Sequence, residues 1–514
     1  MALTSHSEKA GRPIALPAPL GWAAAIAFAL CIAHLALLPL ANGDMYWQVR
    51  AGEILLGQRR FLDHDIFSYT VAGAPWNNHE WLFEVLLALL YRACGWLGLR
   101  LWVLATMGCA FVAVAIYVAR RAGLWMALCV VCAWLGLVWY KFIPAAQTLS
   151  MVLFLLGTWA FLRPDLWVTK RKIALLGFLL VWGNLSAEVV VFLPFLVVDQ
   201  VFRHLRRENP ECPSRRRWLW LGFALVVPTI NPPGASVAEY VLDGTLANRL
   251  VNTEFAHLWE PALSVHPWIK ILAWLVIAAW LALTIASIAT KIRPAPQLVL
   301  LHRRAAPALA IIAAMLFERN LWLLLLPMVQ MALALQRWLQ LRWGPWLAQL
   351  LPGVAAVGFC FFFLHALPWW GPRLAFRDLA RPSFYTSNLS ADDLPISCDG
   401  AVQALPPEQR MLTSRLWGSW HIWRFPNRPV FIDGRNREFP LLLHRFSETV
   451  DGGLPGAQQI LDAFHVDAVL TQPGWLRKPG IVREQWRRVF ATRVCALYQR
   501  ASLARSPDAQ PAMP

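Results

Sequence analysis

The chain has 514 residues, of which 58% are hydrophobic and 15% are charged, whereas soluble domains have about 45–50% apolar and about 25% charged residues. With 29 Trp residues and a mean hydropathy of +0.47, it is too apolar for a soluble enzyme or a disordered protein. The net charge of +17 comes from Lys and Arg residues that separate long apolar runs, which favours membrane topology over nucleic-acid binding as its explanation. We therefore predict a multi-span membrane protein with no nucleic-acid partner.

Apolar runs of about the length that crosses a bilayer follow one another along the chain. They are 20–40, 99–118, 124–140, 146–162, 173–201, 218–230, 268–290, 305–336 and 346–366. Polar residues interrupt two long runs, at Asn184–Glu188 and at Glu318–Asn320. We predict a helical hairpin in each of these two runs, which gives about eleven spans in a membrane domain over 20–366.

Basic residues between the runs predict the orientation, because short cytoplasmic loops are enriched in Lys and Arg. The basic groups on one side of the predicted bundle are Arg120–Arg121, Lys170–Lys172, Arg203–Arg217, Lys291–Arg304, and Arg337 with Arg342. This side is predicted to be cytoplasmic, together with a tail over 1–19. For the first run we favour an uncleaved anchor over a cleaved signal peptide.

The opposite, extracytoplasmic side receives loop 41–98, loop 231–267 and the chain after 366. Within the first loop, 80–97 is apolar but contains Glu84 and Arg92. We interpret 80–97 as a juxtamembrane helix, because a crossing there would move Lys170–Lys172 to the outside.

From 367 to 505 the hydrophobic runs shorten and polar residues return. Strand patterns occur at Met411–Ser414, Arg428–Asp433, Ala468–Thr471 and Val489–Arg500, and helical patterns at Leu441–Val450 and Ala457–Phe464. The alternation predicts a small extracytoplasmic α/β domain, followed by a disordered Pro/Ala-rich tail over 506–514. Cys398 and Cys495 are its cysteines, and the sequence leaves open whether they form a disulfide.

Loop 41–98 is the segment most suggestive of chemistry. It concentrates acids and histidines in a chain with few acids elsewhere: Asp44, Glu53, Asp63, Asp65, Glu80, Glu84, His64 and His79. Trp47, Ala51, Ile54 and Leu55 recur at helical spacing. We predict an amphipathic helix there that lies along the membrane surface with Trp47 at the interface.

Each polar group of this loop also has a structural interpretation. Asp44 could cap the helix that follows it, a role that is compatible with a catalytic one. Asp63 and Asp65 could be solvated turn residues. His79 and Glu80 fit a helix cap better than a metal site.

Three segments of this loop, Gly43-Asp-Met-Tyr-Trp-Gln-Val-Arg-Ala-Gly52, Asp63-His-Asp-Ile-Phe-Ser-Tyr69 and Trp76-Asn-Asn-His-Glu-Trp81, resemble a group of bacterial membrane proteins. That group in turn looks like distant relatives of the GT-C superfamily of integral membrane glycosyltransferases, which use polyprenyl-phosphate-linked sugars. Further motifs of the bacterial group occur at Asn184-Leu-Ser, Asn231-Pro-Pro-Gly, Arg319-Asn320 and Val430-Phe-Ile-Asp-Gly-Arg435. The resemblance leads us to expect small residues near position 188, and Glu188 departs from that pattern.

The resemblance implies a GT-C-like helical bundle with its catalytic carboxylate in the first extracytoplasmic loop. Asp44 matches the acid just after the first span, and Asp63 with Asp65 matches a two-acid motif. We therefore expect Asp44, Asp63 and Asp65 to be catalytic, with Asp44 as the base for the acceptor hydroxyl. Trp47, His64, His79 and Glu80 are the predicted substrate-binding residues of the loop.

Positive charge is needed for the departing phosphate. Arg319, Lys141 and Arg249 are the candidates, because each lies at an outer end or loop of the predicted spans. The alternatives are an ion pair of Arg319 with Glu318 and snorkelling of Lys141 to the interface. A divalent Mg or Mn ion at Asp63 and Asp65 could supply the same charge, but two carboxylates specify a metal poorly.

In the outer domain, Trp417-Gly-Ser-Trp420-His-Ile-Trp423-Arg424 offers aromatic faces for sugar rings, although we favour core packing against a strand. Asp433-Gly434-Arg435 is either a loop site or only a turn.

We predict a glycosyltransferase that moves a hexosyl or pentosyl group from a polyprenyl-phosphate donor to a lipid, glycan or protein acceptor. The expected location is the bacterial inner membrane, with the C-terminal domain in the periplasm. One alternative is a transporter or flippase of lipid-linked glycans, but the sequence shows no duplicated half of the kind found in many transporters. The other is a non-catalytic envelope scaffold, which would give the acidic residues of loop 41–98 no function.

Overall fold

The computed structural model describes residues 18–38, 40, 43–161, 169–205, 214–234, 257–259, 267–289, 305–370 and 394–503. The chain divides into two compact units. Unit 1 comprises Met1–Leu35, Met107–Tyr140 and Val265–Phe376, and unit 2 comprises Ala36–Thr106, Lys141–Ser264 and Arg377–Pro514.

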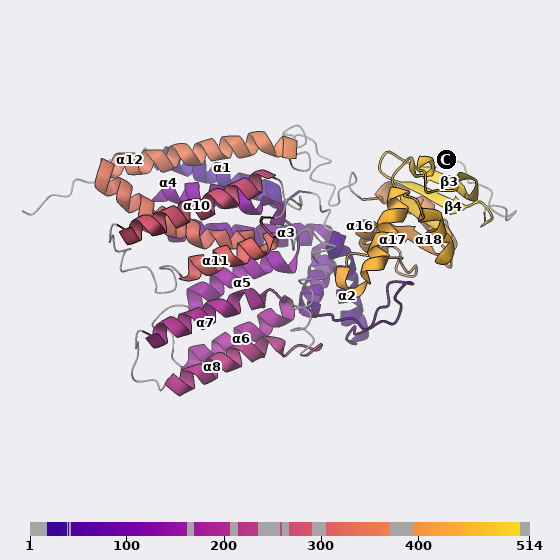
Figure 1. The fold of residues 1–514 in the computed structure, drawn as a ribbon, viewed down its shortest axis with the longest axis horizontal. Coiled ribbons are helices and arrows are strands. Elements are labelled where there is room, and N and C mark those ends of the chain that lie inside the picture. The colour runs from indigo at the N-terminus through magenta and orange to yellow at the C-terminus, as the bar shows by residue number, and fades with distance from the viewer. Residues whose placement is uncertain are drawn as a thin grey trace, which may run out of the picture. The chain divides into compact units, whose positions relative to one another are not determined.

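Unit 1 is a bundle of apolar helices. Its elements are α1 (Ala18–Ala36), the end of α3 (Trp81–Ala122), α4 (Leu124–Val138), α10 (Pro267–Ala289), α11 (Ala305–Leu316), the 3-10 helix η6 (Glu318–Leu324) and α12 (Leu325–Trp370). Figure 1 shows α12 alongside α4, and α12 also contacts α10 and α11. The predicted break of the run 305–336 is confirmed, because η6 separates α11 from α12.

Many apolar side chains of unit 1 point away from the bundle. On α10, Ile271, Leu275 and Ile285 are exposed, whereas Ile269 and Ala273 are buried. Such a surface is unfavourable in water and favourable in lipid. The chain is an integral membrane protein.

Four helices of the described residues are long and apolar enough to cross a membrane: Trp81–Ala122, Leu124–Lys141, Pro267–Ala286 and Glu318–Gly344. Shorter apolar helices are Gly21–Ala36, Ala146–Phe161, Val189–Val201, Trp218–Thr229, Ala305–Leu316 and Trp346–Phe359. The number of about eleven spans stays a prediction.

Unit 2 begins with the helices of the first loop and continues with further helices of its own. They are α2 (Gly43–Gln58), the start of α3, α5 (Ala146–Phe161), α6 (Thr169–Leu185), α7 (Val189–Leu205), α8 (Ser214–Val226) and the 3-10 helix η3 (Val227–Thr229). The predicted break of 173–201 is confirmed at the turn between α6 and α7, where Glu188 is buried.

Helix α3 is interrupted at Gly95, whose φ of +59° is outside the helical range. Glycine is the residue that adopts this conformation without strain. The break separates Trp81–Cys94 from the apolar remainder of α3, which agrees with the distinct helix predicted at 80–97.

The C-terminal part of unit 2 is built on a mixed sheet with the strand order β1-β2-β4-β3. The strands are β1 (Met411–Thr413), β2 (Ala468–Thr471), β3 (Trp486–Ala491) and β4 (Ala496–Arg500); β1 and β2 are parallel, and the other pairs are antiparallel. The helices are η7 (Ile396–Cys398), α15 (Asp399–Gln403), α16 (Arg415–Arg424), η8 (Asn436–Glu438), α17 (Leu441–Gly452), α18 (Ala457–Ala463), η9 (Trp475–Arg477) and η10 (Arg483–Gln485). The predicted α/β character is confirmed.

Two predicted strands of this domain are wrong in detail. Val489–Arg500 is not one strand, because the chain turns between β3 and β4, where Thr492 Oγ1 accepts a hydrogen bond from the Cys495 N–H at 3.2 Å. Arg428–Asp433 forms isolated bridges through Val430 in place of a strand. Pro429, which lacks an N–H group, limits strand pairing there.

The tryptophan motif Trp417–Arg424 forms helix α16. Its predicted packing against a strand is confirmed for Trp417, which lies in one apolar cluster with Met411 and Leu470. Trp420 and Trp423 pack instead with aromatic side chains of α2 and α3, because residues three apart share a helix face.

The first loop pairs with the C-terminal domain through its backbone. Tyr69 N–H donates to Val430 O at 3.0 Å, and Val430 N–H donates to Phe67 O at 2.9 Å. The Thr70 hydroxyl donates to Phe431 O at 2.6 Å. These bonds make residues 67–70 an extra edge of the domain.

Helix α2 is confirmed, but its predicted place on the membrane surface is wrong. Trp47, Ala51 and Ile54 are buried in a cluster with Trp76 and Ile422. The apolar stripe is covered by the loop and by α16, which also contacts α2 (Figure 1).

Cys398 and Cys495 form a disulfide that links η7 to the start of β4 across 97 residues of sequence. Closing so long a loop restricts the unfolded chain, and removing a native disulfide from a small domain costs about 2–5 kcal/mol. We expect the double variant C398A/C495A to lower the thermal midpoint of the detergent-solubilised protein. The variant C94S, which removes an exposed free cysteine, is the matched control; equal midpoints for both would contradict the prediction.

Candidate active site

Asp44 lies in the first turn of α2, shortly after the end of α1 in the sequence. It is exposed, whereas residues 45–49 are buried. Trp47 Nε1 donates to Asp44 Oδ1 at 3.4 Å. The positive end of the helix dipole favours a negative charge at this position, so the carboxylate is both accessible and electrostatically supported.

The carboxylate of Asp44 lies against Gly434 of the C-terminal domain. A Cβ atom built on Gly434 would collide with Asp44 Oδ1 and would come within 3.0 Å of Ser419 Oγ. The Gly434 N–H donates to Ser419 Oγ at 3.1 Å. A side chain at position 434 would therefore have to displace the Asp44 carboxylate.

The next residue, Arg435, is buried between two carboxylates. Its Nε and Nη2 donate to Asp433 Oδ1 and Oδ2 at 2.9 and 2.7 Å, and Nη2 lies 2.5 Å from Asp65 Oδ1. The guanidinium also lies over the rings of Trp76 and Phe67, at 4.8 and 5.1 Å from their centroids. Burial alone would lower the pKa of Arg435, but the two carboxylates raise it above its usual range.

Asp65 is therefore a positioning residue. It is 3% exposed, and besides Arg435 it accepts hydrogen bonds from the Ser68 N–H at 3.0 Å and the Ser68 hydroxyl at 2.6 Å. Three of the acceptor sites of this carboxylate are thereby taken up by protein donors. The predicted catalytic role of Asp65 stays a prediction.

Asp63 and His64 lie on the outside of the same loop. Both are exposed, and His64 Nδ1 is 2.8 Å from Asp63 Oδ1. The hydrogen bond with His64 lowers the pKa of Asp63. The structure thus separates Asp63, which faces solvent, from Asp65, which is buried.

The predicted divalent metal does not fit this pair, because Asp65 is occupied by Arg435. Nor do the residues that the structure describes contain any group of three or more His, Cys, Asp or Glu side chains placed to hold a metal ion.

His79 and Glu80 lie at the turn before α3. His79 Nε2 is 3.7 Å from Glu80 Oε1, and Gln48 of α2 donates to Glu80 Oε2 at 3.3 Å. Asn231 donates to the His79 carbonyl at 3.0 Å and to the Gly183 carbonyl at 3.1 Å. These contacts join α2, α3 and α6.

The predicted phosphate-binding cations fall in different parts of the chain. Lys141 is buried and its Nζ donates to Gln147 Oε1 at 2.5 Å, so the snorkelling interpretation does not hold. Arg319 belongs to unit 1 and lies in η6. Glu318 forms an ion pair with Lys270 of α10, a partner that the sequence did not indicate. Arg249 lies outside the described residues.

The sequence did not indicate Ser419, whose hydroxyl accepts a hydrogen bond from the Gly434 N–H, or Glu438, which lies close to Arg435. Ser419 stands in a tryptophan-rich motif, and the interpretation of that motif rested on its aromatic residues. Glu438 follows Arg435 by three residues in η8 and is half-buried, which nothing in its local pattern indicates.

No protein-family model and no curated protein matches the chain. Among solved structures, it is similar to the oligosaccharyltransferase of Archaeoglobus fulgidus tethered to an acceptor peptide, with 11% identity, a TM-score of 0.48, and coverage of 89% of this chain and 69% of that one. It is also similar to ArnT from Cupriavidus metallidurans bound to undecaprenyl phosphate, with 14% identity, a TM-score of 0.41, and coverage of 95% and 99%. At these identities and TM-scores no activity carries over to this chain.

Burial raises the pKa of Glu438 to about 7, against the opposing effect of Arg435 and Arg437. When folding raises the pKa of an acid, the contribution of that acid to the stability of the folded state is fully present below its unfolded pKa. This contribution is lost as the pH rises through the folded pKa. We expect the stability of the protein to fall between about pH 5 and pH 7.5, and E438Q to flatten this fall in thermal unfolding. The control E484Q, at an exposed position, should retain the wild-type profile; an unchanged profile in E438Q would refute the assignment.

Proposed function

We propose that the chain is an integral membrane glycosyltransferase that moves a sugar from a polyprenyl-phosphate donor to a lipid, glycan or protein acceptor on the extracytoplasmic side. The observation that carries this proposal is the Asp44 carboxylate. It is exposed at the N-terminus of α2, follows the first apolar helix, and lies against a glycine whose loop is anchored by the buried Arg435.

The proposed step is a direct displacement. The acceptor hydroxyl oxygen bonds to the anomeric carbon of the sugar while its proton passes to Asp44, and the bond to the phosphate oxygen breaks. The polyprenyl phosphate leaves with the bonding electron pair, so the configuration of the anomeric carbon inverts. Asp44 fits the base because it is an accessible carboxylate whose position is constrained from two elements.

The leaving phosphate requires positive charge. Arg319 and Arg249 remain the candidates for this role, with Lys141 as a third. Their assignment rests on their predicted place at the outer ends of spans.

The proposed location is a bacterial inner membrane with the C-terminal domain in the periplasm. The Cys398–Cys495 disulfide supports this side, because disulfides persist in oxidising compartments. The basic loops predicted on the opposite side of the membrane agree with it.

Asp44 is tested by the substitution D44N, which preserves shape and removes the base. The purified protein is incubated with radiolabelled polyprenyl-phosphate sugars and envelope extract, and label in the acceptor fraction is measured. We expect D44N to reduce the initial rate by about 10²–10⁴-fold. The control E53Q changes another carboxylate of α2 and should stay within threefold of wild type, roughly the noise of such a comparison.

A second variant tests the geometry without touching the carboxylate. G434A should displace Asp44 and slow transfer, whereas G400A, where a Cβ meets no atom within 4 Å, should not. Wild-type rates in both D44N and G434A would defeat the proposal. Transfer of intact labelled lipid between leaflets, with no label in any acceptor, would favour a flippase instead.

A further inference from the structure

The C-terminal domain contains a cavity of about 990 Å³ that the proposed transfer does not use. It lies where the parallel strands β1 and β2 end, since Ser414 follows β1 and Gln472 and Pro473 follow β2. The carboxyl ends of parallel strands are a common place for ligands. The volume is at the upper end of the range of about 300–1,000 Å³ for small-molecule sites.

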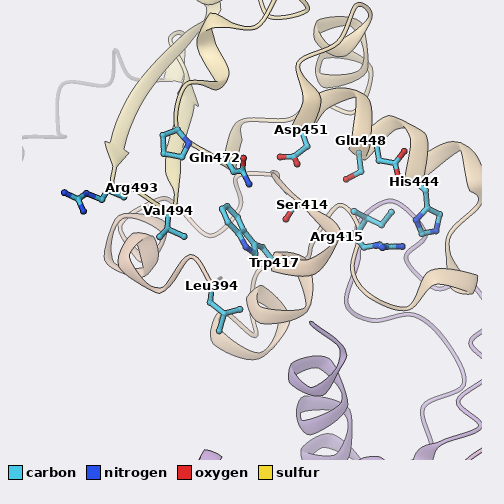
Figure 2. Close-up of a pocket in the computed structure, with 13 residues that line it drawn as sticks. Leu394, Ser414, Arg415, Trp417, His444, Glu448, Asp451, Gln472, Arg493 and Val494 are labelled. Carbon is cyan, nitrogen blue, oxygen red and sulfur yellow. The ribbon is translucent and has the colours of Figure 1, made fainter. Parts of the chain in front are cut away.

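One face of α17 forms a polar wall of this cavity. His444, Ser447, Glu448 and Asp451 line it, and their spacing of three and four residues places them on one side of the helix. Figure 2 shows His444, Glu448 and Asp451 along this helix. Asp451 Oδ1 accepts a hydrogen bond from Thr471 Oγ1 at 2.5 Å, which fixes α17 to the end of β2.

The other walls bring an aromatic ring and two guanidinium groups. Trp417 lies in the middle of the lining in Figure 2, with Arg415 and Arg493 on different sides. Arg415 donates to Asn436 Oδ1 at 2.8 Å, and the Asn436 carbonyl lies 2.7 Å from His444 Nε2. The site is therefore built from side chains with fixed partners.

The lining charges balance, because two arginines face two carboxylates. Burial lowers the pKa of His444, which keeps that ring neutral at neutral pH. Such a lining offers many hydrogen-bond donors and acceptors without net charge, which suits a neutral ligand rich in hydroxyl groups. The negative face of an indole ring attracts the weakly positive C–H groups of a sugar.

We propose that this cavity is a binding site for a neutral oligosaccharide. Glu448, Asp451 and Gln472 hydrogen-bond its hydroxyl groups, and Trp417 stacks on a ring. Neither Asp44 nor Gly434 lines the cavity. Binding here is independent of the proposed transfer.

The test is saturation-transfer-difference NMR on the full-length protein in detergent micelles, with maltotriose, mannotriose and chitotriose as probes. We expect at least one trisaccharide to bind, and E448R, which places a long cation in the cavity, to weaken binding at least tenfold. E448Q should weaken it less. The control E484R makes the same charge change at an exposed position outside the lining and should bind as wild type does.

The two proposals fail in distinguishable ways. D44N should bind the trisaccharide as wild type does, even though transfer is lost. No signal for any of the three trisaccharides, or a signal that E448R leaves unchanged, would overturn the oligosaccharide site without bearing on Asp44. Binding that inorganic phosphate displaces would also overturn it, since that result would show an anion site.

Discussion

Arg435 carries a positive charge into a nearly water-free position, and the carboxylates of Asp65 and Asp433 allow it to remain there. One of these acids belongs to the first loop and the other to the C-terminal domain. Removing one partner from a buried ion pair costs about 3–5 kcal/mol, because the remaining charge is left uncompensated. The pairing therefore fixes the loop to the domain and sets the backbone of Gly434 against the carboxylate of Asp44.

The same constraint explains why the first loop behaves as part of the C-terminal domain. Residues 67–70 bond to the Val430 and Phe431 backbone, and the apolar face of α2 is covered by α16 and the loop. Because α2 is packed against protein on most sides, it holds Asp44 at its N-terminus more rigidly than a helix that lies on a membrane surface would. Catalytic groups need such rigid support, because misplacement by about 1 Å can cost two orders of magnitude in rate.

The sequence predicted what depends on composition and local periodicity. The apolar helices, the breaks at the α6–α7 turn and at η6, helix α2, and helices α17 and α18 all follow from such patterns. Long-range pairing could not be predicted: Asp63-His64-Asp65 looks like one motif, yet Asp65 alone is buried and paired with Arg435, hundreds of residues later in the sequence. Likewise, the apolar stripe of α2 reveals that it is buried but not whether lipid or protein covers it. The cavity at the ends of β1 and β2 is assembled from six separate segments, none of which signals a site alone.

We propose that Arg435 acts on transfer by positioning Asp44 and not by direct contact with the substrate. A double-mutant cycle on the initial transfer rate tests it, using R435K, D44N and R435K/D44N in protein whose fold is verified by thermal unfolding. R435K keeps the charge and loses the two-pronged pairing with Asp433. If Arg435 works through Asp44, R435K should slow the wild type by about tenfold or more and should not slow D44N any further. Equal fold-losses in the two backgrounds would contradict the account.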